Sequence, residues 1–178
     1  MIALEVSSAA RKPPLGGIAG TIRALVGALL RLDPNTRYAL CYRLSRWRRG
    51  HLYRPDAANA CIRVLQDPWN ALVLPRARLL HSMGISLPRT PRGIPKLVTV
   101  HDLNAVKNTE WVTEHWHERR SARIADVIRR ADHVVTYSRF IADEVCEHYG
   151  LPTERVHPVL LGVDATRFAP PSEADVKA

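Results

Sequence analysis

The chain has 178 residues, 46% of them hydrophobic and 24% charged, which suits one globular domain with a core and is short for two. No apolar run approaches the roughly 20 residues that a membrane-spanning helix needs. The three cysteines, Cys41, Cys61 and Cys146, are widely separated and match no metal-ligand spacing. They predict reduced thiols, no structural zinc and a cytoplasmic location.

The net charge of +9 is unevenly distributed. Residues 1–100 carry 16 Lys and Arg against 4 Asp and Glu, whereas residues 101–178 carry 10 against 13. Most of these cations are arginine, whose planar guanidinium binds two phosphate oxygens at once. Nucleic acid, anionic lipid or a diphosphate substrate would be attracted, although an ordinary solvated basic surface explains the charge equally well. Nucleic acid is the unlikely partner, because no helix-turn-helix or RNP-type pattern occurs.

The first predicted elements are a strand over residues 2–6, a loop, the pair Gly16–Gly17 and a helix with apolar residues at helical spacing up to Leu32. A strand, a glycine turn and a helix in this order can bring backbone N–H groups to a phosphate. The two glycines alone are a weak signal, since they form neither GxGxxG nor a P-loop. The alternative is that they serve only the backbone angles of the loop.

Strands and helices continue to alternate along the chain. Further strands are predicted over 38–42, 61–65, 78–82, 96–101, 132–137 and 156–161, and helices over 69–76, 113–130 and 139–149, the last with Ser138 as its N-cap. Arg43 to Pro55 is predicted to be a loop, basic and with an aromatic residue, Trp47. The alternation predicts an α/β fold with a doubly wound, mostly parallel sheet of about seven strands.

The stretch from Lys96 to Leu103 is the predicted central strand. Its apolar, β-branched run is typical of a buried parallel strand, and it ends on His101 and Asp102. Ligands of open parallel sheets bind beyond the carboxyl ends of the strands. His101 and Asp102 therefore lie where acid–base or hydrogen-bond chemistry would occur. In the structural alternative, His101 caps the strand and Asp102 begins a turn; spacing does not decide between them.

Several segments together resemble the N-terminal half of the GT-B glycosyltransferases, in particular the retaining family 4. They are Gly16–Ala19, Leu32–Pro34, Val98–Leu103, Glu110–Trp111, Arg130–Phe140 and Glu154–Asp164. Their order and spacing carry the resemblance, which within the family is greatest to mannosyltransferases and related enzymes of polysaccharide biosynthesis. One departure is Gly20–Thr21, where relatives often have Arg-Tyr.

The resemblance implies a Rossmann-like, acceptor-side domain over residues 1–165 and the start of an interdomain linker over 166–178. It implies that Gly16 and Gly17 lie at the donor diphosphate. His101 would reach the donor sugar and act in catalysis, with Asp102 as its neighbour. The donor would be a nucleotide-sugar, without a metal or a further cofactor. The family's C-terminal nucleotide-sugar domain would follow these residues and is absent from them.

The expected function is therefore the acceptor-binding part of an enzyme that transfers a sugar from a nucleotide-sugar to a saccharide or lipid-linked acceptor. Alone, the domain would be inactive and would need its missing C-terminal domain or a partner subunit. The alternatives are a subunit of a split glycosyltransferase and a non-catalytic basic module at a membrane surface. The expected location is the cytoplasm, with peripheral binding to the inner face of the membrane if the basic half docks on anionic lipid.

Overall fold

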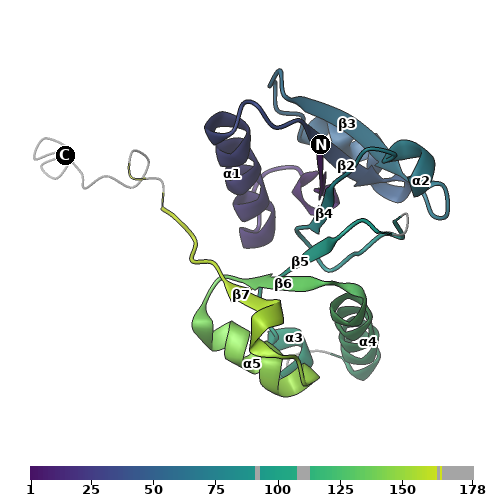
Figure 1. Cartoon of the computed structure of the whole chain (residues 1–178). Helices are drawn as coiled ribbons and strands as arrows, with labels where there is room; N and C mark the ends of the chain where they lie inside the picture. Colours follow the sequence, from purple (N-terminus) through teal and green to yellow (C-terminus); the bar gives the residue numbers. More distant parts are fainter. Residues whose placement is uncertain (91–92, 108–112, 164, 166–178) are drawn as a thin grey trace, which may run out of the picture.

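The computed structural model describes residues 1–90, 93–107, 113–163 and 165. Its centre is one seven-stranded sheet in the order β3-β2-β1-β4-β5-β6-β7, in which every neighbouring pair is parallel (Figure 1). The strands are β1 (Ile2–Glu5), β2 (Tyr38–Arg43), β3 (Ala60–Leu65), β4 (Leu79–Ser82), β5 (Lys96–Val100), β6 (His133–Thr136) and β7 (Val156–Pro158). The predicted Rossmann-like α/β fold is confirmed.

Helices connect the strands. They are α1 (Gly17–Leu32), α2 (Asn70–Val73), α3 (Asn104–Lys107), α4 (Glu114–Arg130) and α5 (Arg139–Tyr149), with 3₁₀ helices η1 (Ser7–Ala9), η2 (Leu44–Leu52) and η4 (Thr153–Arg155). The predicted N-cap of α5 is confirmed, because the Ser138 hydroxyl accepts a hydrogen bond from the Ile141 N–H at 3.2 Å. The same helix ends at Gly150, whose left-handed φ of 62° favours glycine.

The two faces of the sheet bury different side chains because residues alternate along each strand. Leu4 and Leu40 belong to an apolar cluster with Ile22 and other residues of α1, whereas the adjacent Ala39 belongs to a second cluster that includes residues of α4 and α5. In Figure 1, α1 lies beside the β1–β3 part of the sheet, and α3, α4 and α5 lie below the β5–β7 part. The layered core holds the carboxyl ends of the strands along one edge.

The strand order reverses between β1 and β4. From β1 the chain builds outward through β2 and β3, and from β4 it builds in the other direction through β5, β6 and β7. Connections therefore diverge at this point and leave a crevice outside the carboxyl ends of the strands. The stretch predicted to be the central strand is β5, which lies beside the true middle strand, β4.

Some local predictions were wrong. Residues 44–52 form the 3₁₀ helix η2 rather than a loop, since i→i+3 bonding needs no apolar periodicity. Residues 104–107, within the stretch 103–111 for which a loop is predicted from the sequence, form the short helix α3. Strand β7 stops at Pro158 instead of running to Leu161. Pro158 has no N–H to donate and is tolerated because β7 is an edge strand. The Glu110–Trp111 segment, Asp164 and the predicted linker over 166–178 lie outside the described residues.

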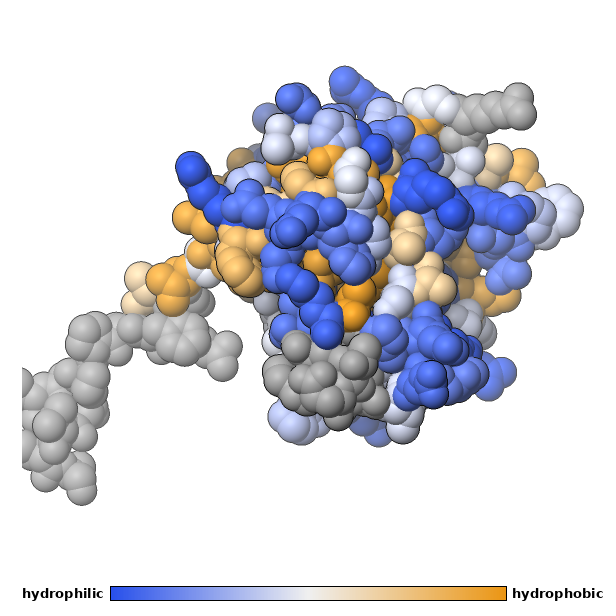
Figure 2. Space-filling model, turned by 90° about the horizontal axis from the view of Figure 1, so that it is seen from below, coloured by the Kyte–Doolittle hydropathy of each residue, from blue (hydrophilic) through white to orange (hydrophobic). Residues whose placement is uncertain are grey.

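Apolar side chains also remain on the surface after β7. Val159, Leu160, Leu161 and Val163 are each more than half exposed. Figure 2 views the side of α3, α4 and α5, where hydrophilic (blue) residues cover most of the face and the segment that leads to the grey C-terminal residues carries apolar (orange) side chains. Among the described residues, no helix is both long and apolar enough to cross a membrane.

Candidate functional site

A cavity of about 350 Å³ lies at the crevice where the strand order reverses. The segments that follow β1, β2, β4 and β5 line it, together with α4. The lining residues are Ser8, Arg11, Gly16, Gly17, Ile18, Ala19, Arg43, Arg46, Gly84, Ile85, His101, Asp102 and Arg120. All four residues predicted from the sequence as site residues therefore meet in one cavity, although they lie up to 86 positions apart in the chain.

The glycine turn places the start of α1 at this cavity. Gly16 is the N-cap of α1 with φ −69°, and Gly17 has no positive φ, so backbone angles alone do not require glycine at either position. A Cβ on either residue would meet nothing within 4 Å. The first N–H groups of α1 receive no side-chain cap, and its first turn has no acidic residue. An anion can therefore approach these N–H groups at the positive end of a 16-residue helix.

His101 is held at the end of β5 by two contacts. Its Nε2–H donates to the Met83 carbonyl at 2.9 Å, and its ring meets the Tyr137 ring edge-on at a centroid distance of 5.2 Å. Burial lowers the pKa of His101 below the usual range, although the hydrogen bond to Met83 opposes this shift. The neutral ring thus keeps Nε2 protonated and leaves Nδ1 as a hydrogen-bond acceptor.

Asp102 is exposed, and it accepts a hydrogen bond from the Asn104 N–H at 3.1 Å, at the start of α3. Asp102 therefore begins a turn, as the structural alternative predicts. The residue nevertheless lines the cavity. The adjoining wall is Arg120 of α4, whose guanidinium carbon lies 5.2 Å from the centroid of the exposed Trp116 ring. Its Nε atom is buried without a hydrogen-bond partner among the described residues.

Positive charge dominates the cavity wall. Among the described residues that line it, four are arginine and one, Asp102, is acidic. The pKa of Arg46 is held below the usual range first by burial and then by repulsion from Arg49, Arg43 and Arg11. Mutual repulsion of this kind is relieved when an anion binds between the guanidinium groups. The electrostatics of the cavity therefore favour a negatively charged ligand.

Glu5 is a buried carboxylate that the sequence analysis did not identify as a site residue. It is the last residue of β1 and only 1% exposed, and both the N–H (3.2 Å) and the hydroxyl of Ser7 donate to its Oε1. Arg43 Nε lies 3.6 Å from the same oxygen. Burial raises the pKa of Glu5, while Ser7 and Arg43 oppose the shift. Glu5 holds Ser7 and Arg43 at the crevice. Its position at the carboxyl end of a predicted strand is the feature of the sequence from which this role could have been predicted.

The loops around the crevice are fixed to each other. The Arg23 guanidinium of α1 donates to the carbonyls of Ala9 (2.9 Å), Arg11 (2.9 Å) and Leu52 (2.8 Å), which ties η1 to the end of η2. On the opposite side, Gly84 in the segment after β4 lies close to the loop after β1. A Cβ on Gly84 would lie 3.0 Å from the Ser8 hydroxyl oxygen. The cavity is therefore formed in advance, with little chain movement needed for binding.

The arrangement provides anion binding and hydrogen bonding to hydroxyl groups. Backbone N–H groups of α1 and the arginines can bind phosphate oxygens, and neutral His101 can accept a hydrogen bond from a sugar hydroxyl. Within the described part of the chain, no group of three His, Cys, Asp or Glu side chains could hold a metal ion together. The charge that meets an anion here comes from the backbone and from arginine.

Comparison with known proteins agrees with this geometry. The sequence model described as Glycosyltransferase Family 4 matches residues 9–167. The D-inositol 3-phosphate glycosyltransferase of Rhodococcus jostii is 31% identical over 94 residues, which are 52% of this chain and 21% of that protein. The enzyme of the same name from Corynebacterium kroppenstedtii is 33% identical over 82 residues, 45% of this chain and 18% of that protein.

A solved structure shows the same fold at low sequence identity. The wall teichoic acid polymerase TagF superposes with a TM-score of 0.54 and 10% identity over 90% of this chain and 38% of that chain. The matched part of the present chain spans about a fifth of the length of the two D-inositol 3-phosphate glycosyltransferases. The similarity therefore concerns one part of these larger proteins.

Proposed function

Because this chain belongs to glycosyltransferase family 4, we propose that it is the acceptor-side domain of an enzyme that transfers a sugar from a nucleotide-sugar to a saccharide or lipid-linked acceptor. The observation that carries the proposal is the shared cavity of Gly16–Gly17, His101 and four arginines at the strand-order reversal. A donor diphosphate and a sugar are the two chemical groups that such a lining would bind side by side.

In this proposal each part of the cavity has a task. The N–H groups at the start of α1 and the nearby arginines offset the charge that develops on the donor diphosphate as the glycosidic bond breaks. His101, neutral and fixed through Nε2, accepts a hydrogen bond from the donor sugar at Nδ1 rather than acting as a nucleophile. The base and ribose contacts belong to a C-terminal domain or a partner subunit.

The acceptor is proposed to carry phosphate. The relatives' name includes D-inositol 3-phosphate, a phosphate ester, and the lining here has four arginines against one acid. Arg120, with its buried and unpartnered Nε, is placed to bind such a group beside Asp102. Mannose from a nucleotide-mannose donor is the first sugar to assay, because the His-Asp-Leu segment at residues 101–103 resembles that of mannosyltransferases.

The decisive experiment joins residues 1–165 to the C-terminal half of a family 4 enzyme, or mixes the two parts, and measures sugar transfer to D-inositol 3-phosphate and to lipid-linked saccharides. Activity is expected only when both parts are present. Calorimetry of the present chain alone should show no tight nucleotide-sugar binding. Binding at about micromolar Kd by this chain alone, or the absence of transfer with every donor and acceptor, would contradict the proposal.

A second candidate function is docking on an anionic membrane surface, which the exposed side of η2 favours. Trp47 is 53% and Leu44 44% exposed there, among Arg46, Arg48 and Arg49. A basic hollow of about 570 Å³ adjoins the same helix. Each basic residue near anionic lipid contributes about 1 kcal/mol, and an interfacial tryptophan suits the headgroup region.

Vesicle sedimentation tests this docking. The chain should bind vesicles of mixed phosphatidylcholine and phosphatidylglycerol but not pure phosphatidylcholine, and binding should be lost at high salt because the Debye length shortens. Replacing Arg46, Arg48 and Arg49 by glutamine should weaken it. The matched control replaces three exposed arginines at the other edge of the sheet, Arg37, Arg76 and Arg78. Equal loss in both triple variants would show that only net charge matters and would remove the assignment to η2.

A further inference from the structure

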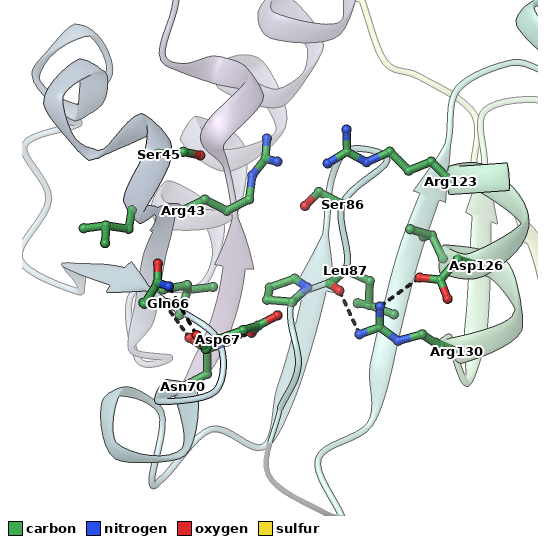
Figure 3. Close-up of a pocket in the computed structure, with 14 residues that line it drawn as sticks. Arg43, Ser45, Gln66, Asp67, Asn70, Ser86, Leu87, Arg123, Asp126 and Arg130 are labelled. Atoms are coloured by element: carbon green, nitrogen blue, oxygen red, sulfur yellow. Dashed lines mark hydrogen bonds and ion pairs between the residues drawn. The ribbon is translucent and has the colours of Figure 1, made fainter. Parts of the chain in front are cut away.

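A second hollow of about 380 Å³ lies at the same edge of the sheet (Figure 3). It is formed by the ends of β2 and β3, by α2, by the segment after β4 and by α4. Arg43 lines both this hollow and the cavity with the glycine turn, so the two spaces adjoin at its side chain. The volume is within the range of about 300–1,000 Å³ that small-ligand pockets occupy.

Two arginines face each other across the opening of this hollow. In Figure 3 the guanidinium groups of Arg43 and Arg123 point toward one another from opposite walls, with Ser86 between them. Arg43 Nε makes no hydrogen bond but forms an ion pair with the buried Glu5 carboxylate at 3.6 Å, and Arg123 makes no hydrogen bond or ion pair with the described residues. Arg130 differs, because it is occupied by Asp126 at 3.0 Å and by the Leu87 carbonyl at 2.8 Å.

The floor of the hollow is polar and fixed. Buried Asn70 accepts from the Gln66 N–H at 2.8 Å and donates to the Arg89 carbonyl at 2.8 Å, and Asp67 accepts from the Arg89 N–H at 3.0 Å. These bonds fix the backbone of Gln66 and the Asp67 carboxylate at the wall, and the Gln66 side-chain amide donates to the Asp67 carbonyl at 3.2 Å. Both side chains line the hollow, where their oxygen atoms can bind hydroxyl groups. None of the 14 lining residues is aromatic, so a base has no ring to stack on.

We propose that this hollow is a second acceptor subsite, which binds an anionic sugar unit next to the unit that receives the transferred sugar. The anion lies between Arg43 and Arg123, and the hydroxyl groups of the sugar bind Ser86, Gln66 and Asp67. Because Arg43 borders both spaces, one acceptor of two or more units can occupy them together. The inference rests on the proposed function for the identity of the neighbouring cavity, but its binding test does not require sugar transfer.

Carboxylate and phosphate share the chemistry that two arginines recognise. The test therefore titrates the ¹⁵N-labelled full chain with digalacturonate as the carboxylate probe and glucose 6-phosphate as the phosphate probe, and with maltose and glucose as their neutral counterparts. Anionic probes should shift the amides of Gln66, Ser86 and Arg123, and should bind at least about tenfold more tightly than the neutral ones. The stronger anionic probe identifies the group.

Arg123→Gln should weaken the anionic probe about tenfold and leave the neutral one unchanged. The matched control is Arg129→Gln, six residues further along α4, where the exposed side chain pairs with Asp126 and does not line the hollow. Both variants change exposed helix positions, and matching spectra will show that they are folded.

Several outcomes would overturn the subsite. They are shifts confined to Gly16, Gly17 and Asp102, equal binding of charged and neutral probes, equal loss in Arg123→Gln and Arg129→Gln, and no binding of any probe. Failure of the proposed function looks different, because it is the absence of transfer in the two-part enzyme whether or not this hollow binds an anionic sugar.

Discussion

The two edges of the sheet use polar residues in opposite ways. At the amino edge, Asp132 accepts from the Lys96 N–H at 2.7 Å, Arg155 donates to the Ala131 and Asp132 carbonyls, and Asn59 donates to two carbonyls at the end of α1. At the carboxyl edge, Arg43 and Arg120 each keep a buried Nε that makes no hydrogen bond with the described residues, although Arg43 Nε also lies 3.6 Å from the Glu5 carboxylate.

This difference separates stability from binding. Polar groups at the amino edge are satisfied within the chain and stabilise the fold, whereas the arginines at the carboxyl edge repel one another and are available to a ligand. A binding site that is electrostatically strained in the free protein costs stability that the rest of the fold must offset. Substitutions at the two edges should therefore have separable effects.

The largest expected effect concerns His81, which lies between the two edges and is bound to Thr99 Oγ1 at 2.8 Å. Burial lowers its pKa from 6.5 to about 4. Between these values the unfolded chain binds a proton that the folded chain does not, so stability present above pH 6.5 is lost as the pH falls, by up to about 3 kcal/mol. Denaturant unfolding from pH 7.5 to 4 measures this loss.

The control for this prediction is His81→Leu, which removes the titrating ring. Burial also raises the pKa of Glu5, which acts in the opposite direction above pH 4.5, but this contribution is common to both proteins. The difference in unfolding free energy between wild type and variant should therefore change with pH. Parallel curves would show that His81 does not titrate as a buried neutral ring.

A carboxyl-edge prediction concerns His101→Ala in the two-part enzyme. We expect kcat to fall about 10- to 100-fold with little change in the donor KM, because a hydrogen bond to a sugar that gains charge is strongest in the transition state. Melting temperature and kcat are measured on the same preparation. Normal kcat with a lowered melting temperature would assign His101 to the architecture of β5 alone.

An amino-edge prediction concerns Arg155→Met, which removes the donors of two backbone carbonyls. The free energy of unfolding should fall by about 1–2 kcal/mol, as measured with urea. Binding of an anionic probe at the other edge should not change. Arg129→Met, which breaks one exposed ion pair, is the control and should cost less than about 0.5 kcal/mol. A loss of anion binding in Arg155→Met would break the separation between the edges.

The smallest expected effect is a gain. Arg46→Gln should raise the free energy of unfolding by up to about 0.5 kcal/mol at low salt, since Arg49, Arg43 and Arg11 repel this guanidinium. Salt should reduce the difference between the two proteins. A destabilised variant would show that Arg46 makes a stabilising contact and that the carboxyl edge is not strained.

Local patterns were sufficient to predict much of this molecule. The run from Val98 to Val100 predicted a buried strand, and the cap at Ser138 predicted the start of α5, because both depend on neighbours in sequence. The same logic placed His101 at a carboxyl end. The meeting of His101 with Gly16 in one cavity followed only from the resemblance, since periodicity does not specify strand order.

The rest depends on tertiary contacts that no local pattern contains. Arg43 and Arg123 face one hollow although 80 residues separate them, and this meeting is visible only after folding. Apolar residues are few in η2, and the segment is short and basic, which is why this 3₁₀ helix was predicted as a loop. The charge of residues 1–100 pointed to an anion, but not to the two adjoining spaces.

Gly84 sets a steric limit on how far the protein can vary. Alanine there would bring a methyl group to 3.0 Å from the Ser8 hydroxyl oxygen, closer than most such contacts, so the Ser8 side chain would have to shift or rotate. Ser8 and Gly84 lie in the loops after β1 and β4, which line the crevice where the strand order reverses. The missing side chain at Gly84 therefore lets the two loops approach each other closely, and it sets their spacing at this point of the crevice.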